Sequence, residues 1–318
     1  MKTLVIVLCQ GRMLEKTFHS LQDNVCKPLN ADLAFVGSSQ NMQELSVINN
    51  YFKHVFNTNE PSSWLHQIDS IHSSKSWRSI ADVSPVILGG TGYGQSVGSG
   101  AIIMYYREVL RQYLNEINTE EYTWFVITRS DFIWTIPHPC VQNLELDKIY
   151  FLDGQRYGGI SDRHAIISKN NITKFLDISL PIFTDGHNLA NRAKNNSVVN
   201  AETLILLRLS ELGLLEKCRF LPYMGATIRS LSTSSRWSQG VYSKKLNLYI
   251  KYPIELRMSV LLKYLFPYGL PWQKYLAGGV IFRYSLYTCI FKVLVKTSQY
   301  KIIDRFINKI FFRLANFK

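Results

Sequence analysis

The amino-acid sequence predicts an α/β fold in which a mostly parallel sheet is flanked by helices. Strand-like apolar runs alternate along the chain with segments of helical period, which is the pattern of parallel strands joined by crossover helices. The run at 122–128, YTWFVIT, is apolar almost throughout, as expected of a strand buried on both faces. At 318 residues, the chain is long enough for one large domain or two.

The first elements indicate a sheet that binds a ligand at its strand ends. The apolar run at 4–9 is shorter than the core of a signal peptide and lacks a small-residue cleavage site, so we interpret it as a buried strand. A helix at 15–25 and a second strand at 32–37 follow. This order is typical of the opening of a nucleotide-binding half-sheet.

The middle of the chain continues this alternation. Residues 57–80 are rich in Ser, Asn and His with weak periodicity, which predicts a loop or lid. The glycine-rich stretch 89–101 leads into an amphipathic helix that extends to Ile117. Beyond it we expect strands at 148–152 and 219–221 and a helix at 200–212.

The positive charge of the chain is concentrated at one end. Of the net charge of +13, residues 241–318 carry +12, from 14 lysines and arginines against two acidic residues. The segment 301–317 sets basic residues opposite an apolar face, which is typical of helices that lie in the plane of a membrane surface. We therefore predict a domain at 1–240 and a basic, aromatic helical region at 241–318.

Several common site types are not indicated. The five cysteines are widely spaced and include no C-x-x-C, so neither a disulfide framework nor a zinc site is predicted, and a reducing cytosol fits best. The histidines have no metal-ligand spacing, and the sequence has no hydrolase elbow and no Walker phosphate loop.

The motif TRSDF at 128–132 is the strongest catalytic candidate, because it directly follows the central apolar run. A carboxylate at a strand end, here Asp131, binds a metal ion or a ribose, and the neighbouring Arg129 can neutralise a diphosphate through its two-pronged guanidinium. The alternative is a structural ion pair that caps the strand.

The glycine-rich stretch is a second candidate. The glycines Gly92 and Gly94 match G-x-G without the third glycine of a dinucleotide fingerprint, which disfavours a dehydrogenase. The helix N-terminus that follows can still bind phosphate through its free amides. A plain surface loop is the alternative.

The loop at 153–164 combines ionisable side chains with permissive glycines, which is typical of a substrate loop. Either Asp162 or His164 can deprotonate an acceptor hydroxyl there. An Asp-Arg turn satisfied by its own backbone is the alternative.

Glu202 lies in the first turn of a predicted helix, where a capping role is the simpler interpretation.

Five segments in this order resemble a known family: GR at 11–12, GSGA at 98–101, TRSDFIW at 128–134, DGQRYGGISDRHAI at 153–166 and NAE at 200–202. They resemble the GT-A-like glycosyltransferases, with a Rossmann-like sheet, of bacterial loci that make lipopolysaccharide, O-antigen or capsule. The resemblance covers roughly residues 3–230. It implies transfer of a sugar from a nucleotide-sugar donor to a hydroxyl of a glycan acceptor.

The resemblance also implies a role for each matching residue. Binding of the donor and its diphosphate is implied for Gly11, Arg12, Gly98, Ser99, Gly100, Arg129 and Asp131. Binding of the acceptor is implied for Asp153, Tyr157, Gly158, Gly159, Arg163 and His164. Asp162 is the first candidate for the acceptor base and Glu202 is the second, because helix-start acids serve as the base in many inverting enzymes of this class.

The chain departs from the family pattern at the metal site. Arg129 and Ser130 stand where other GT-A enzymes carry the first part of an Asp-x-Asp motif, so Asp131 is the one obvious ligand for Mn²⁺ or Mg²⁺. Two options stay open: a divalent metal on Asp131, or neutralisation of the diphosphate by arginines such as Arg12, Arg129 and Arg163.

The basic C-terminal region fits an enzyme that works at an anionic membrane surface on a lipid-linked glycan, since each Lys or Arg near such a surface contributes about 1 kcal/mol. We expect a cytoplasmic protein held peripherally at the inner face of the cytoplasmic membrane. No transmembrane span is predicted, because the best stretch, 276–295, contains Arg283 and Lys292. An ordinary helical subdomain or a dimer interface is the alternative.

Two rival functions compete with glycosyl transfer. A nucleic-acid-binding protein fits the basic charge, but basic residues that alternate with large apolar ones do not form a recognition helix, so no nucleic acid partner is expected. A non-catalytic scaffold of the same fold should leave Arg129, Asp131 and Asp162 apart in space.

Overall fold

The computed structural model describes residues 2–39, 41–57, 60–83, 100–193, 199–231, 240–244 and 247–266. Gly98 and Ser99 lie outside the described residues, and so does the basic segment 267–318 with its expected helix at 301–317. Within the described residues, no helix combines the length and the apolar character needed to cross a bilayer.

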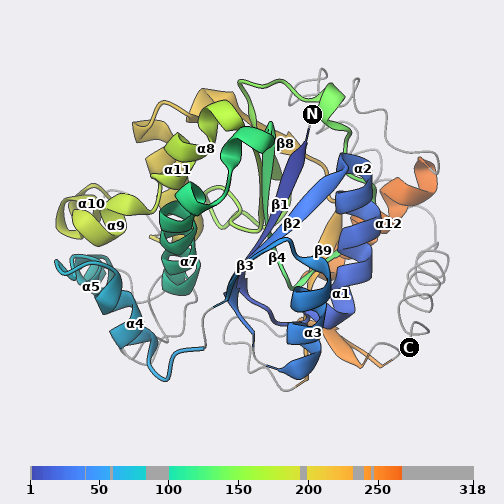
Figure 1. Cartoon of the computed structure of the whole chain (residues 1–318), viewed down its shortest axis with the longest axis horizontal. Helices are drawn as coiled ribbons and strands as arrows, with labels where there is room; N and C mark the ends of the chain where they lie inside the picture. Colours follow the sequence, from blue (N-terminus) through green and yellow to red (C-terminus); the bar gives the residue numbers. More distant parts are fainter. Residues whose placement is uncertain are drawn as a thin grey trace.

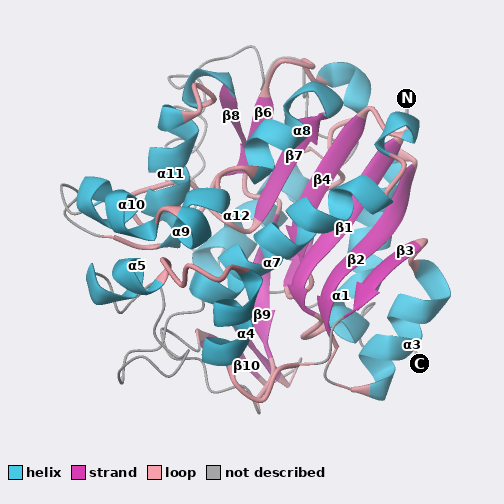
Figure 2. Ribbon diagram, turned by 60° about the vertical axis from the view of Figure 1, so that its left-hand side comes forward, coloured by secondary structure: helices cyan, strands magenta, loops and turns pink. Residues whose placement is uncertain are grey.

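A seven-stranded sheet forms the centre of the molecule (Figure 2). In spatial order its strands are β3 (His54–Asn57), β2 (Ala31–Ser38), β1 (Thr3–Gln10), β4 (Trp124–Arg129), β7 (His164–Ser168), β6 (Ile149–Leu152) and β8 (Cys218–Leu221). All neighbouring pairs are parallel except those of β7, which is antiparallel to both β4 and β6. The predicted mostly parallel sheet is therefore confirmed.

The reversal of β7 decides which loops meet. Thr128 near the end of β4 pairs with His164 at the start of β7, so the chain segment that enters β7 lies beside the segment that leaves β4. The ends of β1, β6 and β8 lie at this same carboxyl edge, because these strands run in the direction of β4. Loops at this edge of an open α/β sheet are the usual place for a ligand.

A second, antiparallel sheet continues from the carboxyl edge. Its strands, in spatial order, are β10 (Val241–Ser243), β11 (Leu248–Ile250), β9 (Gly225–Arg229) and β5 (Phe132–Trp134). Because β5 begins three residues after β4 ends, the same short turn belongs to both sheets. The Ile228 N–H donates to the Asp131 carbonyl at 2.9 Å, which places β9 against that turn.

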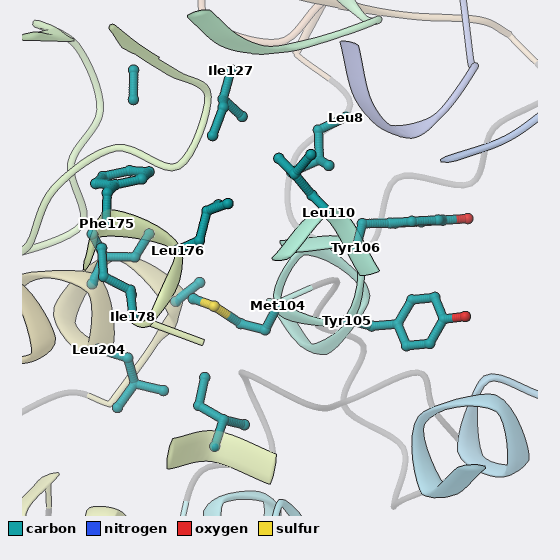
Figure 3. Packing of buried hydrophobic residues seen from close by; sticks show 14 of the residues in the cluster. Leu8, Met104, Tyr105, Tyr106, Leu110, Ile127, Phe175, Leu176, Ile178 and Leu204 are labelled. Atoms are coloured by element: carbon teal, nitrogen blue, oxygen red, sulfur yellow. The ribbon is translucent and has the colours of Figure 1, made fainter. Parts of the chain in front are cut away.

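Helices cover both faces of the large sheet (Figure 1). One face is covered by α4 (Trp64–Ile71), α5 (Arg78–Val83), α7 (Gly100–Tyr113), α8 (Lys169–Leu176), α9 (Leu180–Thr184), α10 (Gly186–Ala193) and α11 (Ala201–Glu211). Even-numbered β1 residues such as Ile6 point into this layer. Figure 3 shows α7 here, with Met104 pointing toward Leu176 and Ile178.

The opposite face carries α1 (Leu14–Leu21), α2 (Lys27–Leu29) and α3 (Met42–Tyr51). Odd-numbered β1 residues, Val5 and Val7, pack against this layer, as the two-residue period of a strand requires. The helix α12 (Pro253–Leu265) packs with the second sheet in a separate cluster that includes Ile228 and Leu256. Short turns complete the list: a π-helical segment at Gln22–Cys26 and 3-10 segments at Leu114–Glu116, Thr119–Glu121, Val141–Asn143 and Leu215–Lys217.

Within the described residues, the predicted strands and helices are found within a few residues of the expected positions, but the prediction of a loop or lid at 57–80 is wrong. Helix α4 lies wholly within this segment and α5 begins in it. Ser63 caps α4 by accepting from the His66 N–H at 3.4 Å, and Asp69 accepts from the indole N–H of Trp77 at 2.9 Å. The Ser-rich composition is therefore that of caps and turns around buried anchors such as Trp77, which is 1% exposed.

A pair of buried histidines packs against Trp134 of β5. His138 and His164 are 2% and 1% exposed, and their Nε2 atoms are 3.3 Å apart. Burial lowers the pKa of His138 to about 4. Burial, together with the charge of His138, lowers the pKa of His164 well below its ordinary value. Both rings are therefore neutral in the folded protein at neutral pH.

We expect the folded state to lose stability as the pH falls from about 6.5 toward about 4. The unfolded chain protonates both histidines near their ordinary pKa, whereas the folded chain does not, so unfolding takes up protons. The free energy of unfolding should fall by up to roughly 1.4 kcal/mol per pH unit for each histidine. Urea unfolding curves recorded across this range measure the slope.

The variant His138→Gln should lower that slope by up to roughly 1.4 kcal/mol per pH unit, because one group that gains a proton on unfolding is removed. The exposed His66 provides the control, and His66→Gln should leave the slope unchanged. If His138→Gln and the parent protein show the same slope, the buried pair does not control acid stability.

Candidate active site

A cleft opens at the carboxyl edge of the large sheet, where β1 and β4 end. It has a cavity volume of about 50 Å³, is open to solvent and is lined by Gln10, Arg12, Ile102, Ile103, Arg129, Ser130, Asp131 and Arg229. The Ser130 hydroxyl donates to the Gln10 carbonyl at 2.6 Å, which fixes the turn after β4 against the end of β1. Three of the predicted donor residues, Arg12, Arg129 and Asp131, therefore share one cavity.

Two arginines hold the carboxylate of Asp131. Arg129 donates through Nε to one oxygen at 3.0 Å and through a terminal nitrogen to the other at 2.8 Å, which is the two-pronged geometry. Arg229 donates to the second oxygen from the opposite side. Burial alone would raise the pKa of Asp131, but the two arginines outweigh it and hold the pKa below its ordinary value.

Arg129 also reaches the loop that enters β7. Its other terminal nitrogen lies 3.3 Å from the carboxylate of Asp162, whose carbonyl accepts from Arg107 at 3.4 Å. Asp131 and Asp162 are both nearly buried, at 4% and 9% exposed. One guanidinium thus joins the strand-end motif to the substrate loop.

These residues do not fit a divalent metal site. Both oxygens of Asp131 are engaged by guanidinium groups, so a metal ion at this carboxylate would have to displace Arg129 and Arg229 while lying next to their charges. Within the described residues, no three histidine, cysteine or acidic side chains gather where they could hold a metal ion.

The turn after β1 completes the floor of the cleft. Gly11 donates its N–H to the Ser38 carbonyl at 2.7 Å, and a Cβ at Gly11 would lie 3.4 Å from both the Phe35 ring and that carbonyl. Gly11 therefore allows close packing and brings Arg12 into the cleft. Burial is the main cause that lowers the pKa of Arg12, while Glu60 acts in the opposite direction. The Nε of Arg12 is buried without a hydrogen-bond partner in the described part of the chain.

The substrate loop is docked against the start of α11. The Ile160 N–H donates to the Glu202 carbonyl at 3.1 Å, and the Asn200 side-chain amide donates to the Tyr157 carbonyl at 2.9 Å. A side chain at Gly159 would clash with the Glu202 backbone, which explains why a glycine is needed there. Gly158 has a positive φ of 83°, a conformation that favours glycine.

Glu202 lies in the first turn of α11 and has a raised pKa. Asn200 caps α11 by accepting from the Thr203 N–H at 2.8 Å, so Glu202 lies in the first turn beside the cap rather than being the cap itself. Burial, followed by the nearby charge of Asp162, raises the pKa of Glu202 to about 7. A carboxyl group with such a pKa can accept a proton at neutral pH.

Arg163 is buried in an ion pair that crosses to α12. It donates to Glu255 through both terminal nitrogens, one of them at 2.9 Å, and the side chains are 6% and 5% exposed. Burial alone would lower the pKa of Arg163, but Glu255 outweighs it and raises the pKa. Glu255 also accepts from the Gln155 N–H at 2.8 Å. Arg163 therefore anchors the loop to α12. Because its guanidinium is engaged by Glu255, it is not free to contact an acceptor, which is the role that the resemblance implied.

The remaining loop residues separate into an exposed group and a core group. Tyr157 is 46% exposed, has a positive φ of 46° and shares a 2.8 Å hydrogen bond between its hydroxyl and that of Tyr252. Asp153 accepts from Arg156 at the base of the loop. His164 packs against Trp134 with ring centroids 4.9 Å apart and is 1% exposed, so it belongs to the core and we leave it out of the proposed acceptor site.

Sequence reasoning missed Arg229, Lys251 and Glu255. Arg229 ends β9, Lys251 directly follows β11 and Glu255 lies on α12, all beyond the motifs that carry the resemblance. Arg229 ends a short apolar strand, and Lys251 and Glu255 lie in a basic region that was interpreted as membrane-associating. The pairing of β9 with the turn after β4 places Arg229 in the site, and the pairing of β11 with β9 places Lys251; both pairings are visible only in three dimensions.

No protein-family model matches this chain, and no curated protein matches it in sequence. Among solved structures, the chain is similar to mouse xyloside xylosyltransferase 1 in its apo form, with 9% identity, a TM-score of 0.36 and coverage of 70% of this chain and 85% of that chain. The function proposed below rests on the site itself.

Removing one partner of the buried Arg163–Glu255 pair should strongly destabilise the protein. We expect Glu255→Ala to lower the free energy of unfolding by about 3–5 kcal/mol, because it leaves a buried guanidinium without its counter-ion. The exposed pair of Lys27 and Asp23 is the matched control, and Asp23→Ala should cost less than about 1 kcal/mol. Denaturant unfolding measures both. Equal costs for the two variants would show that the loop does not depend on this anchor.

Proposed function

We propose that the protein is a glycosyltransferase that moves a sugar from a nucleoside-diphosphate donor to a hydroxyl group of a glycan acceptor. The observation that carries the proposal is the position of Arg129, which lines the cleft at the carboxyl edge of the sheet beside Asp131 and also contacts Asp162. Such an edge is where α/β sheets bind nucleotides, and a cationic cleft there suits a diphosphate leaving group.

The donor side of the site comprises Gly11, Arg12, Arg129 and the start of α7. We propose that the guanidinium groups bind the diphosphate and that Asp131 positions them, since both of its oxygens are engaged by arginines. Gly100 begins α7, and free amides at a helix N-terminus add to the attraction for phosphate. Gly98 and Ser99, which precede it, stay part of the proposed donor site.

On the acceptor side, we propose that Glu202 is the general base. Asp162 is engaged by Arg129, whereas Glu202 has its pKa raised to about 7 by burial and by Asp162. In this arrangement, Asp162 positions Arg129 and keeps Glu202 basic enough to take a proton. The exposed Tyr157 ring, held in a left-handed backbone conformation, is suited to stacking on a sugar of the acceptor.

The finer assignment follows from the sequence resemblance and from the charge of the C-terminal region. We propose a surface-polysaccharide glycan, linked to a lipid, as the acceptor, and a peripheral location at the anionic inner face of the cytoplasmic membrane. Support comes from the +12 balance of residues 241–318 and from their alternation of basic and aromatic residues. A non-catalytic scaffold gives no reason for Arg129 to join the two acids in an open cleft.

A reaction assay tests the proposal most simply. The protein should release nucleoside diphosphate from one member of a panel of UDP-, GDP- and dTDP-sugars when a glycan acceptor extract is added. We expect Asp131→Asn to reduce this release at least about 100-fold, because a neutral amide no longer orients the two arginines. A folded Asp131→Asn variant that keeps full activity would contradict the role given to the cleft.

The pH dependence of transfer tests the base. We expect the rate to rise through about pH 7, since Glu202 is active only when ionised. Glu202→Gln should lower the turnover about 10²–10⁴-fold while donor binding is kept. Asp162→Asn should retain part of the activity and move this rise to lower pH, because the charge that raises the pKa of Glu202 is gone.

The exposed Glu216, in the 3-10 segment that follows α11, serves as the control, and Glu216→Gln should have the parent profile. If Asp162→Asn abolishes transfer and Glu202→Gln leaves the rise near pH 7 in place, the base is Asp162.

A further inference from the structure

Two further cations lie near Asp131: Arg229 ends β9, and Lys251 directly follows β11. In the pairing of β11 with β9, Tyr249 lies opposite Arg229 and Ile250 lies opposite Ile228. The Lys251 N–H donates to the Thr227 carbonyl at 2.9 Å, so the register extends one residue beyond β11. Arg229 and Lys251 are thereby brought to the turn that carries Asp131.

Lys251 is placed among like charges. Burial is the main cause that lowers the pKa of Lys251, to about 8, and the next causes are the charges of Arg229 and Arg129. Asp131 and Asp162 act in the opposite direction but more weakly. Within the described residues, the ammonium group of Lys251 has no hydrogen bond or ion pair with a carboxylate, and it lies 5.0 Å from the centre of the Tyr252 ring.

A structural ion-pair network explains only part of this arrangement. Asp131 accounts for Arg129 and Arg229, and Glu60 faces Arg12, but Lys251 adds a partly buried charge that these acids do not pair. Holding cations together away from water costs free energy, which a bound anion recovers. Arg12, which also lines the cleft, has a buried Nε without a hydrogen-bond partner in the described part of the chain, so it too would gain from a bound anion.

We propose that Arg229 and Lys251, together with Arg129 and Arg12, bind the diphosphate of the donor and take the place that a divalent metal has in related chemistry. The inference rests on the proposed function, because it names the groups that bind the donor of that same reaction. In the transfer step, the acceptor oxygen bonds to the anomeric carbon and the bond from that carbon to the diphosphate oxygen breaks. The electron pair stays on the diphosphate, where these cations stabilise it, and the acceptor proton goes to Glu202.

This group of four cations differs from a metal site in the ligand features that determine its affinity. Guanidinium and ammonium groups attract any diphosphate through charge and hydrogen bonds, so the affinity depends on the number of phosphate groups and falls with ionic strength. A nucleoside monophosphate should therefore bind more weakly than the diphosphate, and chelators should leave binding of both unchanged. The second sheet then contributes to binding of the diphosphate, because two of the four cations, Arg229 and Lys251, stand at the ends of its strands β9 and β11.

Titration calorimetry with UDP, GDP and dTDP, in buffer with EDTA and in buffer with manganese, tests the inference. We expect one diphosphate to bind in EDTA and Lys251→Gln to weaken that binding at least about tenfold. Lys251→Arg should stay within about threefold of the parent protein, because it keeps the charge. The exposed lysine of α8, Lys174, is the matched control, and Lys174→Gln should bind as the parent does.

The outcomes separate this inference from the proposed function. Binding that requires manganese would overturn the cationic site and leave glycosyl transfer standing. Binding in EDTA that Lys251→Gln does not weaken, in a variant with the parent melting temperature, would overturn the role of Lys251. If no diphosphate binds in either buffer, the proposed function fails as well.

Discussion

The site depends on the two-pronged contact between Arg129 and Asp131. This pair forms in the turn that ends β4 and begins β5, so it lies where the two sheets meet. Arg229 approaches it from β9, and Asp162 approaches it from the loop before β7. Each of these contacts needs the guanidinium in one orientation, which Asp131 sets. The nearly buried charge of Asp131 is stabilised because both of its carboxylate oxygens have a guanidinium partner.

The topology of the large sheet explains why these groups meet. With β7 reversed between β4 and β6, the loop at 153–163 returns to the same edge where β1 and β4 end. The loop is then fixed from two sides, by the backbone of Glu202 at the start of α11 and by Glu255 on α12. Rigid elements hold the ionisable groups in place, as a site that stabilises charge in a transition state requires.

The sequence was informative where the signal is local. The apolar run before TRSDF predicts β4, and Asn200 followed by an apolar face predicts the start of α11, because strand burial and helix capping act over a few residues. The segment 57–80 was misread, since its helices are held by buried anchors such as Trp77 and not by their own periodicity. Lys251 could not be assigned, because its role depends on pairing with a strand about 20 residues earlier.

The central claim is that cations at the carboxyl edge of the sheet bind the donor diphosphate. A crystal structure of the protein with its nucleoside diphosphate tests it most directly. The account predicts phosphate oxygens within hydrogen-bond distance of Arg129 and Lys251, with Asp131 still held between its two arginines. A diphosphate bound elsewhere, or an Asp131 that has left its arginines to hold a metal ion, would contradict it.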